Sequence, residues 1–124
     1  MPLINLEILQ DPIPQPELDS EQVQQLCDAI GQAMGSRQAG TWLKVSYLSR
    51  GQYAENQELL VPDIRPVFAY IIRAELLPNA QLQEEAQRLA AVIGQHLDRP
   101  QQNIHIIYEP EGKGRIAFGG QLVE

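Results

Sequence analysis

Residues 92–97 read Val-Ile-Gly-Gln-His-Leu and residues 29–34 read Ala-Ile-Gly-Gln-Ala-Met, so one short pattern occurs twice in the chain. Each copy lies in a segment whose apolar residues recur every three or four positions, which is typical of an amphipathic helix. The match extends further towards the N-terminus, since Leu26 falls on Leu89 when residues 29–34 are aligned with residues 92–97. Internal identity of this kind indicates a duplicated structural unit.

Two predicted strands flank each predicted helix, because short apolar or alternating runs stand on either side of both. The run that begins at residue 67 is nearly all apolar, so we expect it to be a central strand. The four predicted strands cover residues 3–9, 42–48, 67–77 and 104–108.

The first helix carries clear signals at both ends. Either Asp19 or Ser20 caps its start, and Gln22 stands three residues after Asp19, as in a capping box. Gly35 follows the last apolar position, where a left-handed glycine commonly ends a helix.

The second helix is predicted to open at residues 78–79 and cannot continue through Pro100. The order strand, helix, strand therefore occurs twice, with repeat units at about 2–50 and 66–120. We expect a single α+β domain over residues 1–124, in which a duplicated βαβ unit forms a four-stranded sheet with two helices on one face.

The predicted fold leaves the other face of the sheet uncovered. A large exposed apolar surface is uncommon in monomers, so we expect copies of the chain to associate through this face.

Composition narrows the classes of function. The chain has 124 residues, 16 acidic against 9 basic side chains, and a net charge of -7. No basic stripe is present, so neither nucleic acid nor an anionic membrane surface is an expected partner. No apolar run is long enough to span a bilayer, no signal peptide is recognised, and Cys27 is the single cysteine, so we expect a cytoplasmic protein.

Three features carry a resemblance to a known family. They are Met1-Pro2 directly before a strand, the duplicated unit, and the tail Asp98-x-Pro100-x-x-x-Ile104-His105-Ile106-Ile107, followed by Lys-Gly-Arg-Ile-Ala-Phe-Gly-Gly at residues 113–120. The chain thereby resembles the tautomerase superfamily, which includes 4-oxalocrotonate tautomerase, macrophage migration inhibitory factor and the chloroacrylic acid dehalogenases. It looks like the fused, two-unit form of that family. The resemblance implies a homotrimer with pockets at subunit boundaries.

Pro2 is the catalytic residue that the resemblance implies. Removal of Met1 would expose a secondary amine, and burial in an apolar pocket lowers the pKa of such a group below the ordinary 7.7–8.0 of an α-amino group. A neutral amine can take a proton beside a carbonyl and return it elsewhere, which is keto–enol tautomerisation of an α-keto acid or its enol without a cofactor. In the simpler interpretation, Pro2 only begins an edge strand, where proline is tolerated.

The resemblance also indicates a substrate pocket with altered chemistry. His105 stands where 4-oxalocrotonate tautomerase has an arginine that binds the substrate carboxylate, and it cannot form the arginine fork. Ile107 replaces a pocket asparagine of migration inhibitory factor, and Ile116 takes the place of an aromatic wall residue. In the simpler interpretation, His105 is a partly buried strand histidine.

Four cations are candidates to hold a small carboxylate substrate, although for each a solvated or structural role is the simpler interpretation. In order of preference they are Lys44, Arg37, Arg115 and Arg73. Because an unpaired charge inside an apolar strand is costly, Arg73 either lines a pocket or pairs with a carboxylate such as Glu7.

Other signals predict no further chemistry. His96 and His105 lack a third ligand at metal spacing, so no metal site is expected. Cys27 and Trp42 are expected to be packing residues. Two alternatives to an enzyme remain: a non-enzymatic trimeric scaffold or small-ligand-binding protein with this fold, and a generic ferredoxin-like regulatory domain.

Overall fold

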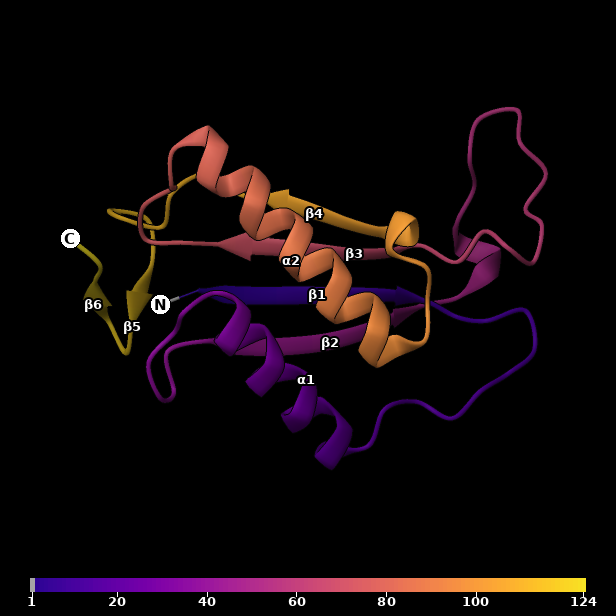
Figure 1. The fold of residues 1–124 in the computed structure, drawn as a ribbon, viewed down its shortest axis with the longest axis horizontal. Coiled ribbons are helices and arrows are strands. Elements are labelled where there is room, and N and C mark those ends of the chain that lie inside the picture. The colour runs from indigo at the N-terminus through magenta and orange to yellow at the C-terminus, as the bar shows by residue number, and fades with distance from the viewer. Residues whose placement is uncertain (1) are drawn as a thin grey trace.

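The computed structural model describes residues 2–124 and contains two βαβ units in succession (Figure 1). A short hairpin, not predicted from the sequence, follows them near the C-terminus. Neither helix in the described part combines the length and apolar character needed to cross a membrane. The elements are β1 (Leu3–Leu9), α1 (Ser20–Ala33), β2 (Trp42–Leu48), the 3-10 turn η1 (Arg50–Gln52), β3 (Val67–Ile72), α2 (Asn79–Leu97), the 3-10 turn η2 (Gln101–Asn103), β4 (Ile104–Tyr108), β5 (Ala117–Phe118) and β6 (Gln121–Leu122).

The four long strands form one mixed sheet in the order β2-β1-β3-β4. Within each unit the two strands pair directly and in parallel, and β1 pairs antiparallel with β3 at the centre. Both helices cover the same face (Figure 1), so the predicted α+β class and layout are confirmed. A ferredoxin-like domain inserts another strand between the two strands of each unit, so this topology excludes that alternative.

The central strand pair relates the two units to each other. Aligning Ala29 with Val92 shifts the chain by 63 residues, and the same shift carries Leu6 onto Ala69. In the sheet, Leu6 and Ala69 are also direct antiparallel partners. The two units are therefore related by a half-turn about an axis through this pair.

The core lies between the sheet and the helices. Alternate residues of β1, namely Ile4, Leu6 and Ile8, are almost fully buried on the helix side. The opposite face of β3 carries Phe68 and Tyr70, which are only half-buried because nothing from the described chain covers the whole of that face. This open face is the surface that we expect a second copy to cover.

The helix-end signals act largely as predicted. Asp19, rather than Ser20, is the N-cap of α1: its carboxylate accepts from the backbone N–H of Gln22 at 2.8 Å, and the Gln22 side chain accepts from Asp19 N–H. Gly35 has a φ of 66°, the left-handed conformation that glycine adopts without strain. Helix α2 ends before Pro100, because Asp98 already adopts the left-handed conformation as C-cap.

The third strand is shorter than predicted. It ends at Ile72 rather than at residue 77. Its partner β1 begins at Leu3, and Leu3 and Ile72 form the last pair of the two strands. Beyond this point the backbone bonds to the C-terminal segment instead, since Gly112 N–H donates to the carbonyl oxygen of Arg73 at 2.7 Å.

The prediction that Arg73 pairs with Glu7 is wrong. Its guanidinium donates to Glu85, a carboxylate of α2 with 1% of its surface exposed, at 2.9 Å. Tyr108 donates its hydroxyl to the other oxygen of Glu85 at 2.9 Å. Glu7 lies at the level of Phe68, towards the other end of β3, and cannot reach Arg73.

Two tyrosines make stability sensitive to alkaline pH. Burial first, and then the bond to Glu85, raise the pKa of Tyr108, while burial and Glu55 raise the pKa of Tyr53 to about 12. A pKa raised in the folded state favours the neutral hydroxyl, so this stabilisation is complete below pH 10 and is lost as the pH rises towards 12 and beyond. Urea unfolding at several pH values should show a decline above pH 10 that is smaller in Tyr108→Phe. Parallel pH curves would contradict this assignment.

Candidate active site

Pro2 is buried at the beginning of β1, beside the first residue of β2. Its carbonyl oxygen accepts from the backbone N–H of Trp42 at 3.0 Å, which continues the parallel ladder between the two strands. A cavity of about 190 Å³ opens next to it, which we call the aromatic hollow. The aromatic hollow is lined by Pro2, Arg37, Ala39, Gly40, Trp42 and Phe118.

A second hollow, of about 520 Å³, lies on the other side of Pro2 and is lined by residues 73–78, Lys113 and Glu124. Its cations are already paired, Arg73 with Glu85 and Lys113 with Glu75 at 3.1 Å. An incoming carboxylate would meet these neutralised cations together with the Glu124 side chain. This second hollow is therefore a poor site for an anion.

Arg37 is the cation best placed to meet a ligand beside Pro2. It is exposed at the edge of the aromatic hollow, and within residues 2–124 it forms no ion pair. A guanidinium with free N–H groups can bind a carboxylate through two parallel hydrogen bonds. Of the four candidate cations, Arg37 alone lines the hollow that carries no acidic side chain.

A tight turn between α1 and β2 positions Arg37. The Gly40 N–H donates to the carbonyl oxygen of Arg37 at 2.9 Å, and Ala39 adopts a left-handed φ of 59°. A Cβ at Gly40 would lie 2.9 Å from that carbonyl oxygen, so the close approach requires glycine here.

Two aromatic rings form the wall of the hollow. Trp42 and Phe118 pack edge to face, with ring centroids 5.0 Å apart and planes at 73°. Trp42 also donates its indole N–H to the carbonyl oxygen of Ala39 at 3.1 Å. The ring is thereby fixed to the turn that carries Arg37.

His105 and Ile107 lie on the open face of β4, away from Pro2 of the same protomer. His105 is paired in register with Phe68, whose ring centroid is 5.4 Å away, and Phe68 pairs with Glu7 near the far end of β1. One protomer alone therefore does not bring His105 to Pro2.

Lys44 and Arg115 are both exposed and line neither hollow beside Pro2. Lys44 lies on β2 opposite Asn5, two residues beyond Trp42. Ile116 packs against the backbone of Gly112, where an added Cβ would lie 3.0 Å from its Cδ1 atom. Phe118 lines the hollow beside Pro2, whereas Ile116 does not.

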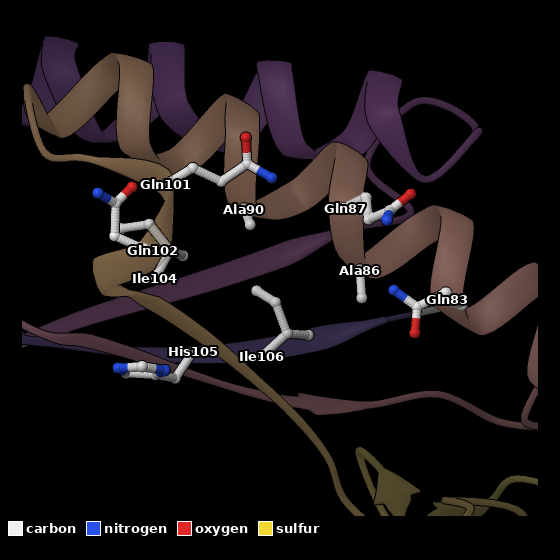
Figure 2. A pocket seen from close by; sticks show the side chains of 9 residues that line it. All are labelled: Gln83, Ala86, Gln87, Ala90, Gln101, Gln102, Ile104, His105 and Ile106. Carbon is white, nitrogen blue, oxygen red and sulfur yellow. The ribbon is translucent and has the colours of Figure 1, made fainter.

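A further hollow, of about 590 Å³, lies between α2 and β4 (Figure 2). Ile106 points towards α2 in this view and His105 points away from it. Apart from His105, the lining carries side-chain amides and apolar groups and no carboxylate. Its lining residues are Gln83, Ala86, Gln87, Ala90, Gln101, Gln102, Ile104, His105 and Ile106. Within residues 2–124 no three acidic, histidine or cysteine side chains come together in a way that could hold a metal ion.

Sequence reasoning missed both wall residues. Trp42 is expected to be a sheet-packing residue, yet 53% of its surface is exposed. A signal was available, since Trp42 is the first residue of a strand that must pair beside Pro2. Phe118 carried no comparable signal, because its contact with Trp42 joins positions 76 residues apart in the chain.

No family model matches the sequence, and no curated protein sequence matches it significantly. Solved structures, however, match over nearly the whole chain. A fused 4-OT described as a wild-type symmetric trimer aligns with a TM-score of 0.75 at 13% identity, covering 98% of this chain and 94% of that one. Pt0534 inactivated by 2-oxo-3-pentynoate gives 0.72 at 14% identity, with the same coverage.

A macrophage migration inhibitory factor from Trichinella spiralis aligns with a TM-score of 0.66 at 11% identity, covering 97% of this chain and 98% of that chain. These likenesses are structural, because the identities are far too low to carry function. The chain has the tautomerase fold, as the resemblance implied.

Proposed function

We propose that the chain is a cofactor-independent keto–enol tautomerase in which Pro2 is the general acid and base. The observation that carries the proposal is the aromatic hollow, where buried Pro2, an arginine that forms no ion pair within residues 2–124, and two aromatic rings surround one small cavity. The fold shared with 4-OT and migration inhibitory factor structures supports it.

The chemistry needs a free amine at Pro2, which requires removal of Met1, a residue outside the described part of the chain. Apolar surroundings and a nearby arginine both disfavour the charged form of an amine. A neutral Pro2 nitrogen then accepts a proton from the enol hydroxyl or from carbon and returns it to the other position. The proline ring restricts the direction of the nitrogen, so less orientation is needed when substrate binds.

Arg37 is proposed to bind the carboxylate of an α-keto acid or its enol. A bidentate contact fixes the substrate plane and leaves the neighbouring carbon facing Pro2. It also stabilises negative charge that develops on the conjugated system as the proton leaves.

The active assembly is proposed to be a homotrimer. The open face of the sheet supplies a surface for association, and the fused 4-OT is described as a symmetric trimer. In that assembly His105, Ile107 and Lys44 would come from a neighbouring copy to the pocket edge, as the family resemblance implies. Ile116 and Arg115 do not line the aromatic hollow of one copy, and they stay proposed as substrate-binding residues because of the family resemblance.

Substitution of Arg37 by glutamine tests the carboxylate site. Arg37→Gln should raise KM for phenylenolpyruvate about tenfold or more, since hydrogen bonds to charged groups contribute roughly 1.5–3 kcal/mol. The methyl ester of phenylenolpyruvate carries no carboxylate charge, so the wild type and Arg37→Gln should convert it equally well. Arg88→Gln, a change to an exposed arginine of α2, is the matched control. Equal losses of activity on the acid and on the ester would show that Arg37 supports the structure and does not bind the carboxylate.

The alternative is a non-enzymatic scaffold or small-ligand-binding protein with the same fold. Histidine in place of arginine at residue 105 favours it, because the carboxylate contact expected from the resemblance is missing. Intact mass of the purified protein distinguishes the two proposals, since a retained Met1 converts the Pro2 nitrogen into an amide that cannot accept a proton.

A further inference from the structure

We propose that the end of the molecule opposite Pro2 is a docking surface for a basic segment of a partner protein, in which apolar side chains stand between lysines or arginines. This inference goes beyond the proposed function and does not rest on it. The surface is a cavity of about 730 Å³, which we call the far groove. It is lined by parts of residues 8–22, 62–65 and 96–99, together with Tyr47.

The far groove lies at the end of the sheet where β1 finishes, and on the side that the helices cover. Pro2 precedes the first residue of β1, whereas Ile8 of the groove is the next-to-last residue of that strand and is buried on the helix side. The loops at residues 10–19 and 53–66 extend from this end, away from the N-terminus (Figure 1). Association of copies through the open face of the sheet therefore does not use the far groove.

Most of the negative charge of the chain gathers around the far groove. Residues 10–21, 49–66 and 96–103 carry eight acidic side chains against three arginines, a balance of -5 out of a net charge of -7. Such a surface repels nucleic acids and anionic lipids and attracts a cationic partner.

All three arginines at this end are already bonded within the chain. Arg50 donates to three loop carbonyl oxygens at 3.0, 3.1 and 3.2 Å. Arg65 pairs with Asp11 at 2.6 Å, and Arg99 donates to the carbonyl oxygens of Leu9 and Arg65 at 2.7 and 3.0 Å. The arginines thus hold the loops in place, and seven of the eight acids form no ion pair within residues 2–124.

Asp98 stands where a cation would stabilise the helix. It is the C-cap of α2, at a left-handed φ of 53°, and the carbonyl end of a helix favours positive charge. His96 is the basic residue of the last turn, and its Nδ1 contacts the carbonyl oxygen of Val92. Asp63 lines the same groove from the loop before β3. A cation entering the groove can pair with both carboxylates.

Apolar surface accompanies these charges. Ile8, Leu18 and Leu97 line the far groove, and Ile13 lines it while 73% of its surface remains exposed. A proline stands on either side of Ile13 and fixes the local backbone, so this side chain loses little freedom when a partner covers it. The groove therefore offers apolar contacts as well as negative charge.

A buried donor favours a peptide over a simple amine. The Arg99 side chain is 4% exposed, and within residues 2–124 its Nε–H donates to no acceptor. No fully buried side-chain nitrogen or oxygen in the described chain lacks a partner, so this Nε–H is accessible from the cavities that Arg99 lines. A backbone carbonyl of an extended segment can accept from it while neighbouring lysines meet Asp63 and Asp98. An amine alone supplies no acceptor.

The binding test uses a short, capped peptide in which lysine and leucine alternate, with a dye at one end. Fluorescence anisotropy at low ionic strength, where exposed charges are least screened, gives its affinity. The wild type should bind this peptide more tightly than a lysine–serine peptide of equal charge, and more tightly than a glutamate–leucine peptide of equal apolar content. Absence of binding by the lysine–leucine peptide would overturn the proposal.

A charge-neutralised variant locates the site. Asp63→Asn combined with Asp98→Asn should weaken binding roughly 2- to 30-fold, as expected for the loss of two exposed ion pairs. Asparagine tolerates the left-handed conformation, so the end of α2 is kept. Glu111→Gln combined with Glu124→Gln is the matched control, because it removes the same charge near the Pro2 end and should change affinity by less than about twofold. Ile13→Ser should weaken binding about threefold or more.

Three results would each overturn the proposal. Equal affinity of the wild type and the double asparagine variant would place the peptide elsewhere. Equal affinity for the lysine–leucine and lysine–serine peptides would show attraction to net charge alone. Displacement of the peptide by spermidine at equal concentration would identify a small polyamine, and not a protein segment, as the occupant. Circular dichroism of each variant excludes misfolding as the cause of weaker binding.

Discussion

Replacement of Pro2 by alanine should lower kcat/KM for enol ketonisation by about 10²- to 10⁴-fold, the usual contribution of a general acid–base group. The Pro2→Ala protein retains a terminal amine after Met1 removal, but it is a primary amine on a flexible residue. This substitution removes the proline ring from the lining of the aromatic hollow but leaves Arg37 and both aromatic rings in place, so binding of the non-reacting 3-phenylpropanoate should stay within about twofold. The measurement is ketonisation of phenylenolpyruvate followed by its ultraviolet absorbance.

Two controls accompany this experiment. Intact mass must show that Met1 is absent from both proteins, and gel filtration must show the same oligomeric state. Ketonisation at the wild-type rate by the alanine variant would rule out Pro2 as the proton-transfer group. A wild type with no rate above buffer would instead favour the scaffold or ligand-binding alternative.

Substitution of Arg73 by alanine should destabilise the fold by about 3–5 kcal/mol, since it leaves a buried carboxylate without its cation. Glu85 is 1% exposed, and among residues 2–124 the hydroxyl of Tyr108 would be its one remaining side-chain partner. A loss of this size is a large share of the free energy of unfolding of a typical domain, which is roughly 5–15 kcal/mol. The free energy of unfolding can be measured by urea titration.

A matched set of variants isolates the charge effect. Combining Arg73→Met, Glu85→Leu and Tyr108→Phe removes every member of the network. The triple variant should therefore recover most of the unfolding free energy that Arg73→Ala loses. If Arg73→Ala lowers the free energy of unfolding by less than about 1 kcal/mol, solvent reaches Glu85 and the Arg73–Glu85 ion pair behaves as a surface contact.

Local patterns were enough to predict the two helices, the four long strands and the repeated order of strand, helix and strand. The apolar periodicity, the capping box at Asp19 and the glycine at residue 35 each act over a few residues, so they can be recognised without the fold. The end of β3 could not be predicted in this way. It depends on where the partner strand begins, which is a property of the register and not of the apolar residues up to Leu77.

The same difference between local patterns and long-range contacts applies to the candidate site. Pro2 and Arg37 were among the candidates that the family resemblance suggested, and both line one hollow. Trp42 and Phe118 were missed because their contact joins distant segments. The partner of Arg73 was misassigned for a similar reason, since strand alternation does not indicate which helix carboxylate lies beneath it.

The half-turn that relates the two units has a consequence for how such a chain can evolve. Under the shift that carries Leu6 onto Ala69, Pro2 falls on Arg65, whose nitrogen belongs to a peptide bond inside the chain. Under the proposed function only the first of these two equivalent positions can therefore carry the proton-transfer group. Substitutions at the second position would then leave the proposed proton transfer untouched. Arg65 bonded to Asp11 at 2.6 Å is what now occupies it.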